Sequence, residues 1–339
     1  MVVRNIAIFT GGAVIGAVAA GSYFKSKKES QPAAVTVIQT PDSIKASRSV
    51  SAPLPEVPAR NGPVVVPRPP PSTSVGNSLK ILPHGFPGPV NDLFVREGYI
   101  ASYNRRLRHP NWVAEHLTTE SLKGGDGVGR GNSHFMEDST VPDLYRAKLT
   151  DYVRSGYDRG HMAPAADCKS SQSAMDETFY LSNIAPQVGK GFNREYWAHF
   201  ENFCRTLTEK YPDVYVVTGP LYLPYQDPAN GKFYVKHEVI GDPPNIAVPT
   251  HFYKIILTDR GNGDMSVGAF VLPNDVIHDD VPLTKFQVRV EHIEMASGLK
   301  FFESLERKLL KDLCKDTTCK IVKHPKSLKN KDQKALPAH

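Results

Sequence analysis

Prolines concentrated before residue 80 limit how much of this chain can form a compact fold. Between Gln31 and Lys80 they recur at short intervals among Ser, Val and Ala, and they end in the run Pro69-Pro70-Pro71. A segment of this composition cannot bury a core, so residues 31–80 are predicted to form an extended, disordered linker. The globular domain is therefore expected within residues 81–319.

Residues 1–30 have the composition of a targeting or membrane-anchor segment. Ile6 to Phe24 contains no charged residue, with Arg4 before it and three lysines soon after it. At about 1.5 Å per residue, this stretch nearly spans a bilayer core of roughly 30 Å. A cleaved secretory signal, with Ala19-Ala20-Gly21 as its cleavage site, and a mitochondrial presequence are the alternatives. A single membrane anchor fits the length best.

The positive charge of the chain lies outside the predicted domain. The net charge is +6, but residues 1–80 hold nine Lys/Arg against three Asp/Glu, and residues 320–339 hold six Lys against one Asp. Residues 81–319 are therefore slightly acidic, and a polyanion could bind them only at a local basic patch. We interpret residues 320–339 as a lysine-rich C-terminal tail that favours solubility.

The cysteines do not form a framework. Four of them, without a CxxC pair, are too few for a disulfide scaffold and wrongly spaced for a zinc site. Cys314 and Cys319 could bridge in an oxidising compartment, but free thiols are the favoured interpretation.

Strand and helix patterns alternate along the domain. Aromatic and β-branched runs predict strands at Thr178–Leu181, Val214–Thr218, His251–Leu257 and Val267–Leu272. Helices are predicted at Asn193–Tyr211 and Leu299–Leu313, the second from its apolar residues at helical spacing. This interleaving favours an α+β fold built on a mainly antiparallel sheet flanked by helices.

The segment Gly156–Pro164 carries the residues with the clearest chemical meaning. It places Asp158 and Arg159 beside Gly160-His161, and glycine permits an unusual backbone path there. Asn193 follows in a second polar block and is expected to open a helix. Glu201 would then lie two turns along the same side of that helix.

These segments resemble endonuclease G, the mitochondrial group of the DNA/RNA non-specific endonucleases, within the ββα-metal (His–Me finger) nucleases. The resemblance rests on Asp158–His161, Asp176–Asn183 and the Asn193 helix, continues loosely through Thr218–Tyr222, and covers about residues 85–315. It implies an α+β fold with a ββα-metal active site.

The resemblance also implies a role for each motif residue. His161 corresponds to the general base, and imidazole titrates near neutral pH. Asn193 corresponds to the direct protein ligand of Mg²⁺ or Mn²⁺, an ion that keeps most of its waters. Glu201 corresponds to the acid that holds this water shell. Arg130 and Arg159 are the candidate phosphate-binding residues.

Two neighbouring residues are expected to support the site. Asp158 would support the motif, and Asn183 would order the loop around the histidine. Each site residue also has a purely structural interpretation. A lone histidine is usually structural, Asn193 could be a helix N-cap, and Glu201 could simply pair with Arg205 on a helix surface.

As in the family, the protein is expected to hydrolyse single- and double-stranded DNA and RNA, leaving 5′-phosphates. It is expected to be a homodimer. It is also expected to be anchored in the mitochondrial inner membrane, with its domain in the intermembrane space and possible release to the nucleus. No base-reading element such as a helix-turn-helix is apparent, which agrees with contacts to the nucleic-acid backbone.

Two other functions fit parts of the sequence. One is a membrane-tethered nucleic-acid-binding protein with basic tails and a vestigial nuclease site, although His161, Asn193 and Glu201 are all present. The other is a phosphodiesterase of the same fold that acts on small nucleotides.

Overall fold

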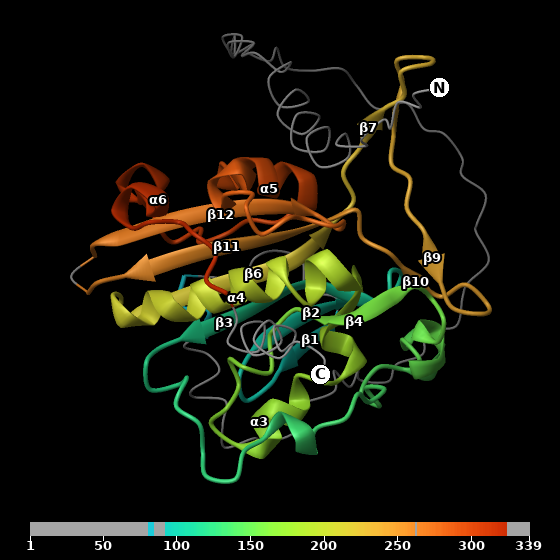
Figure 1. Cartoon of the computed structure of the whole chain (residues 1–339), viewed down its shortest axis with the longest axis horizontal. Coiled ribbons are helices and arrows are strands. Elements are labelled where there is room, and N and C mark those ends of the chain that lie inside the picture. The colour runs from blue at the N-terminus through green and yellow to red at the C-terminus, as the bar shows by residue number, and fades with distance from the viewer. Residues whose placement is uncertain (1–80, 85–91, 262, 324–339) are drawn as a thin grey trace, which may run out of the picture.

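An antiparallel sheet organises the structure, a computed structural model that describes residues 81–84, 92–261 and 263–323. Its eight strands run in the order β1-β2-β3-β6-β11-β12-β13, with β14 pairing parallel to β12 (Figure 1). Their bounds are β1 Asp92–Val95, β2 Ile100–Asn104, β3 His109–Leu117, β6 Asp213–Leu221, β11 His251–Asp259, β12 Met265–Pro273, β13 Gln287–Val288 and β14 Lys311–Asp312. The mainly antiparallel α+β fold is confirmed.

The central strands are apolar on both faces. In β6, Val214 and Val216 enter one apolar cluster, whereas Tyr215 and Val217 enter the cluster on the opposite face. Successive side chains of a strand point to opposite sides, so a continuous apolar run means that both sides are covered. The predicted strands within β6, β11 and β12 are confirmed.

Helices cover the two faces. On one face, α4 (Tyr196–Thr206) buries Trp197 and Phe200 in the first cluster. On the other, α5 (Val290–Ser297) buries Val290 and Ile293 in the second. We call these the α4 face and the α5 face. Figure 1 shows α4 crossing β6 and β3 and α5 lying by β12. The remaining helices are α3 (Gln172–Glu177) and α6 (Leu313–Asp316).

Three two-stranded sheets lie outside the central one. They are β4–β5 (Tyr157–His161 and Ile184–Val188), β7–β8 (Tyr225–Gln226 and Phe233–Tyr234) and β9–β10 (Val239–Ile240 and Ile246–Ala247). The β4–β5 pair packs on the α4 face through Ala185 of β5 and through Met162, which follows β4. The β7–β8 hairpin projects away from the body (Figure 1).

The predicted helix at 299–313 is wrong. The helix in this region is α5, which ends where Gly298 adopts a left-handed φ of 72°. Phe302 also has a positive φ, of 53°, which no right-handed helix allows. The apolar residues whose spacing predicted this helix do not lie on one side of a helix. Phe302 is buried on the α5 face of the sheet, and Leu313 is buried on the α4 face.

Two other local predictions need correction. Thr178–Leu181 is not a strand: Thr178 caps the end of α3, and Leu181–Asn183 forms a tight helical turn. The helix predicted from Asn193 begins at Tyr196, because residues 189–193 form a separate turn. Asn193 therefore precedes α4, and Glu195 occupies the N-cap position without a side-chain cap bond.

The C-terminal boundary lies slightly beyond residue 319. Ile321 and Val322 pack against the apolar cluster of the α4 face, and Asn202 donates a hydrogen bond to the Val322 carbonyl at 3.3 Å. Cys314 and Cys319 form a disulfide, so the free-thiol interpretation is wrong for this pair. Cys168 and Cys204 are buried free thiols.

The predicted linker at 31–80 and anchor at 1–30 lie outside the described residues, as do the last residues of the tail. Among the described helices, none has both the length and the apolarity needed to cross a membrane.

Buried histidines make the fold sensitive to acid. Burial lowers the pKa of His109 and of His251 to about 4, and that of His161 to about 3. These rings stay neutral in the folded state, but bind protons near pH 6.5 when unfolded. Their contribution to stability is complete above pH 6.5 and is lost as the pH falls toward the folded pKa values.

We therefore expect the unfolding temperature to drop between pH 7 and pH 4.5, with each histidine contributing about 1.4 kcal/mol per pH unit. Thermal unfolding followed by circular dichroism measures this. His109→Gln should flatten the dependence, whereas His278→Gln, at an exposed histidine, should not. A wild-type unfolding temperature that does not change over this range would contradict the expectation.

Candidate active site

The predicted motif residues meet where β4, β5 and α4 come together. Antiparallel pairing sets Asp158 opposite Gln187 and His161 opposite Ile184. The chain then turns through Gly189–Asn193 and enters α4. Two strands followed by a helix thus present Asp158, Arg159, His161, Asn193 and Glu201 from one small unit, although up to 43 residues separate them in sequence.

Asp158 fixes the orientation of Asn193. The Asn193 amide donates from Nδ2 to Oδ2 of Asp158 at 2.9 Å, and Arg194 makes an ion pair with the same carboxylate. Burial would raise the pKa of Asp158, but the bonds from Arg194 and Asn193 and the nearby positive charges lower it. The carboxylate can only accept here, so Oδ1 of Asn193 is left for another partner, and no described residue donates to it.

A glycine makes the turn before Asn193 possible. Gly191 adopts a φ of 86°, and a Cβ there would lie 2.6 Å from the side chain of Val276. Any other residue would be strained and would collide. Gly160 is required for close packing and not for the unusual backbone path that the sequence predicted. Its φ is not positive, but a Cβ would meet the buried Gln187 side chain at 2.0 Å.

His161 lies in an aromatic enclosure. Its ring is 5.3 Å from the ring of Phe135 and 4.8 Å from that of Phe179, and it is 7% exposed. Burial, and secondarily the charge of Arg130, lower its pKa to about 3, so the imidazole is neutral. Nε2 is buried without a partner among the described residues. A neutral ring with a free nitrogen can accept a proton.

The two predicted arginines stack on the outer sides of these aromatic rings. The guanidinium of Arg159 lies 4.3 Å from the ring centre of Phe135, and that of Arg130 lies 5.3 Å from Phe179. Both arginines are exposed, and with Asn193 and Arg194 they line an open cavity of about 390 Å³. Three guanidinium groups thus form the local basic patch that an acidic domain needs to bind a polyanion.

Asn183 orders the loop after His161, as predicted. Its Nδ2 donates to the carbonyls of Ala163 and Thr178 at 2.9 and 2.8 Å, and its Oδ1 accepts from the Ala163 amide at 3.0 Å. The side chain is fully buried and every polar atom is bonded, so it holds the chain on both sides of the β4–β5 pair.

Glu201 does not make the surface pair that its spacing allows. Arg205 instead bonds Asp167 at 2.6 Å, and Glu201 makes no ion pair with a described residue. Burial raises the pKa of Glu201 to about 7, against the lowering effects of Lys254, Arg205 and Arg130. A partly exposed carboxylate surrounded by cations but unpaired is available to an external partner.

The cavity does not contain every predicted residue. Arg130, Arg159 and Asn193 line it, whereas His161 and Glu201 do not; the charge of Arg130 acts on both, so they lie close by. Arg194 and the two phenylalanines were not predicted as site residues. Arg194 adjoins Asn193 in sequence, but Phe135 lies in a stretch without any motif.

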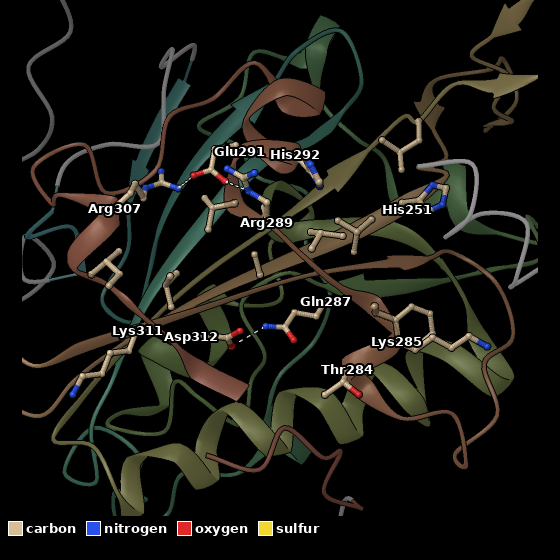
Figure 2. Close-up of a pocket in the computed structure, with 18 of the residues that line it drawn as sticks. His251, Thr284, Lys285, Gln287, Arg289, Glu291, His292, Arg307, Lys311 and Asp312 are labelled. Carbon is tan, nitrogen blue, oxygen red and sulfur yellow. Dashed lines mark hydrogen bonds and ion pairs between the residues drawn. The ribbon is translucent and has the colours of Figure 1, made fainter. Parts of the chain in front are cut away.

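A larger cavity, of about 630 Å³, lies elsewhere, along β12 and the start of α5. None of the predicted site residues lines it. Figure 2 shows several of its polar groups paired with one another: Arg289 and Arg307 meet Glu291, and Gln287 meets Asp312. The smaller cavity is the candidate site, because three of the predicted residues, Arg130, Arg159 and Asn193, line it.

The donor set fits a hydrated hard cation. The described residues contain no group of three or more His, Cys, Asp or Glu side chains that could enclose a metal ion. A free amide oxygen on Asn193, held in place by Asp158, suits Mg²⁺ or Mn²⁺ retaining most of its waters. It does not suit a zinc site, which needs several nitrogen or sulfur ligands.

Comparison with known proteins agrees with this geometry. The family model for DNA/RNA non-specific endonucleases matches residues 77–308. The chain is 52% identical to the mitochondrial nuclease of Saccharomyces cerevisiae over 75% of this chain and 80% of that protein. It is 44% identical to mitochondrial endonuclease G of Homo sapiens, over 67% and 74% of the two chains.

A solved structure also matches, a chain of the EndoG/EndoGI complex. The TM-score is 0.66 and the sequences are 48% identical, over 68% of this chain and 93% of that one. The family model spans more than half of the sequence, and the yeast relative is 52% identical over most of both chains. The chain therefore belongs to the family of DNA/RNA non-specific endonucleases.

Proposed function

We propose that this protein is a mitochondrial endonuclease that hydrolyses DNA and RNA with His161 as general base and a divalent metal ion held by Asn193. The observation that carries this proposal is the bond from Asn193 to Asp158, which leaves the amide oxygen free beside three arginines. If the enzyme contacts the phosphates of its substrate and not the bases, it needs no particular sequence, which agrees with a family described as non-specific.

His161 would take the proton from the attacking water. Its ring enters the reaction neutral because burial lowers its pKa, and Phe135 and Phe179 fix its plane. The water oxygen then forms a bond to phosphorus while the bond to the 3′ oxygen breaks, which leaves a 5′-phosphate. Arg130 and Arg159 would neutralise the phosphoryl oxygens, with their side chains held against the aromatic rings.

Asn193 would hold the metal ion, with Glu201 orienting its water ligands. When bound, Mg²⁺ or Mn²⁺ offsets negative charge on the phosphoryl group and on the leaving oxygen. Asp158 contributes indirectly, since its bond to Nδ2 keeps the Asn193 oxygen turned outward.

Substitutions should separate the base from the metal ligand. His161→Ala should still bind Mg²⁺ and DNA, but its cleavage rate should fall by about two to four orders of magnitude. Asn193→Ala should lose metal affinity together with turnover. Excess Mn²⁺ should restore activity partly to Asn193→Ala and not to His161→Ala, in initial rates measured against metal concentration.

Plasmid degradation by the wild type with and without EDTA is the control, and EDTA should abolish it. Added imidazole should restore activity to His161→Ala more than to Asn193→Ala if it enters the aromatic enclosure. If metal rescues His161→Ala and leaves Asn193→Ala inactive, the two assigned roles are exchanged.

A phosphodiesterase for small nucleotides is the second candidate, because the arginines line an open cavity that would also admit a single nucleotide. Plasmid and a dinucleotide ester should be compared as substrates. The endonuclease proposal expects plasmid to be the far better one. The vestigial-site alternative requires that neither is cleaved, although His161, Asn193 and Glu201 are all present and Asn193 lines the cavity.

We also propose anchoring in the mitochondrial inner membrane, with the catalytic domain in the intermembrane space and release to the nucleus as a later event. The uncharged run Ile6–Phe24 and relatives named as mitochondrial nucleases support this. Full-length protein should stay in the membrane pellet after carbonate extraction of purified mitochondria. Its complete recovery in the supernatant would rule the anchor out.

A homodimer is proposed as well. The β7–β8 hairpin exposes Tyr225, Phe233 and Tyr234, followed by exposed Val235. A projecting two-stranded hairpin has little stability of its own, and an exposed apolar patch of this kind is typical of an interface. Sedimentation should give twice the chain mass of 37.4 kDa. Phe233→Asp with Tyr234→Asp should give the monomer mass, and an unchanged mass would exclude the hairpin from the interface.

A further inference from the structure

Three polar side chains form a row inside the α4 face of the central sheet. On β3, Glu115 lies between Val113 and Leu117, which both belong to the apolar cluster of the α4 face. On β11, Lys254 lies between Phe252 and Ile256 of the same cluster. Thr218 of β6 pairs in register with Lys254 and lies one diagonal step from Glu115. Their exposures are 1%, 1% and 0%.

Lys254 is held firmly in this row. Its Nζ donates to Oγ1 of Thr218 at 2.8 Å and lies 4.8 Å from the ring centre of Trp197 on α4. An ammonium keeps two further N–H donors, and a buried cation is tolerated only where negative charge compensates it. The compensating groups must therefore lie around it.

Helix α4 turns one side toward the row. Trp197, Glu201 and Arg205 follow one another at intervals of four residues and so share one side of the helix. Since Lys254 lies under Trp197, Glu201 comes one turn further along the same side. Lys254 is also the largest opposing charge on Glu201 and on Glu115, so both carboxyls lie near it.

The charges of the row and of the α4 side above it do not balance if all of them are ionised. Arg205 and Asp167 compensate each other in their 2.6 Å ion pair. Lys254 is then left facing two carboxyls, Glu115 and Glu201. Both oxygens of Glu115 are buried without partners among the described residues, and burial raises its pKa well above the usual value. Glu115 is therefore the carboxyl that keeps its proton, and Lys254 serves Glu201.

We propose that Lys254 is a positioning residue for phosphodiester hydrolysis: its buried ammonium, fixed between Thr218 and Trp197 one helical turn from Glu201, supplies the positive charge that the Glu201 carboxylate faces. The inference rests on the proposed role of Glu201 and adds to it a residue that touches neither nucleic acid nor metal. It also explains why a lysine occupies the centre of β11, between Phe252-Tyr253 and Ile255-Ile256.

The charged groups facing Glu201 set the direction of the pH effect. Lys254, Arg205 and Arg130 lower its pKa, whereas Asp167 raises it, and burial outweighs them to leave it at about 7. Glu115 faces Lys254 from β3. Removal of the Lys254 charge should raise the pKa of Glu201 further. Because the ionised form is the active one, the acid limb of the rate profile should then move to higher pH.

The test compares Lys254→Met with the wild type and with Lys311→Met, the same change at an exposed lysine that pairs with Asp264. We expect the acid limb of kcat to move up by about one pH unit in Lys254→Met, which is about tenfold in rate below the limb, with an unchanged KM for DNA. Lys311→Met should match the wild type. In metal-free enzyme, the ¹³C-labelled carboxyl signal of Glu201 should titrate at correspondingly higher pH.

Glu115→Gln combined with Lys254→Met is the second variant. It replaces the buried carboxyl that faces Lys254 as well as the ammonium, so no ionisable side chain of the row is left without its neighbour, and it tests the inference if the single variant does not fold.

The same substitution made in Glu201→Gln enzyme distinguishes failure of this inference from failure of the role proposed for Glu201. If Lys254 acts through Glu201, adding Lys254→Met to Glu201→Gln should cause no further loss of kcat. An equal loss in both backgrounds, or an acid limb that does not move, would overturn the inference. Full activity of Glu201→Gln alone would instead refute the role proposed for Glu201.

Discussion

The central sheet is buried on both faces, and this constraint governs the rest of the domain. Each strand from β3 to β12 must supply apolar side chains to two clusters, so helices from opposite directions must cover it. Polar side chains can be buried between the sheet and its helices only where hydrogen bonds or opposite charges compensate them. The site exploits this rule, since α4 covers one face and also carries Glu201, while the β4–β5 pair rests on the same face and carries His161. Packing and chemistry therefore use the same contacts.

The site itself is a set of short bonds between distant residues. Asp158 and Asn193 are 35 positions apart, yet their bond decides which atom of the amide faces outward. Asn183 reaches 20 positions back to Ala163. Arg130 and Arg159 lie on aromatic rings and pair with no acid among the described residues, which leaves their N–H groups unclaimed, whereas Arg194 pairs with Asp158. Such a site is rigid where it must orient groups and open where a phosphate would enter.

The sequence predicted those parts of the fold and of the candidate site that depend on local residue patterns. Continuous β-branched runs predicted the strands in β6, β11 and β12, and the motif around His161 predicted the residues that meet there. It failed where tertiary contacts override local pattern. The spacing of Phe302, Leu305 and Leu309 is helical, but Phe302 and Leu313 are drawn to opposite faces of the sheet. Glu201 and Arg205 have helix-pair spacing, but Asp167 takes the arginine. Phe135 and Lys254 carry no motif, so only the fold reveals what they touch.

The first described residues enter the domain on the side away from the site. Ile81 is buried in the cluster of the α5 face, and His84 lies 5.4 Å from Tyr215 and 6.2 Å from Phe302 there. His161, Asn193 and Glu201 all belong to the α4 face. The start of the described domain and the cavity therefore lie on opposite faces of the central sheet. A long, stiff duplex bound at the arginines would not compete for space with the segment around Ile81.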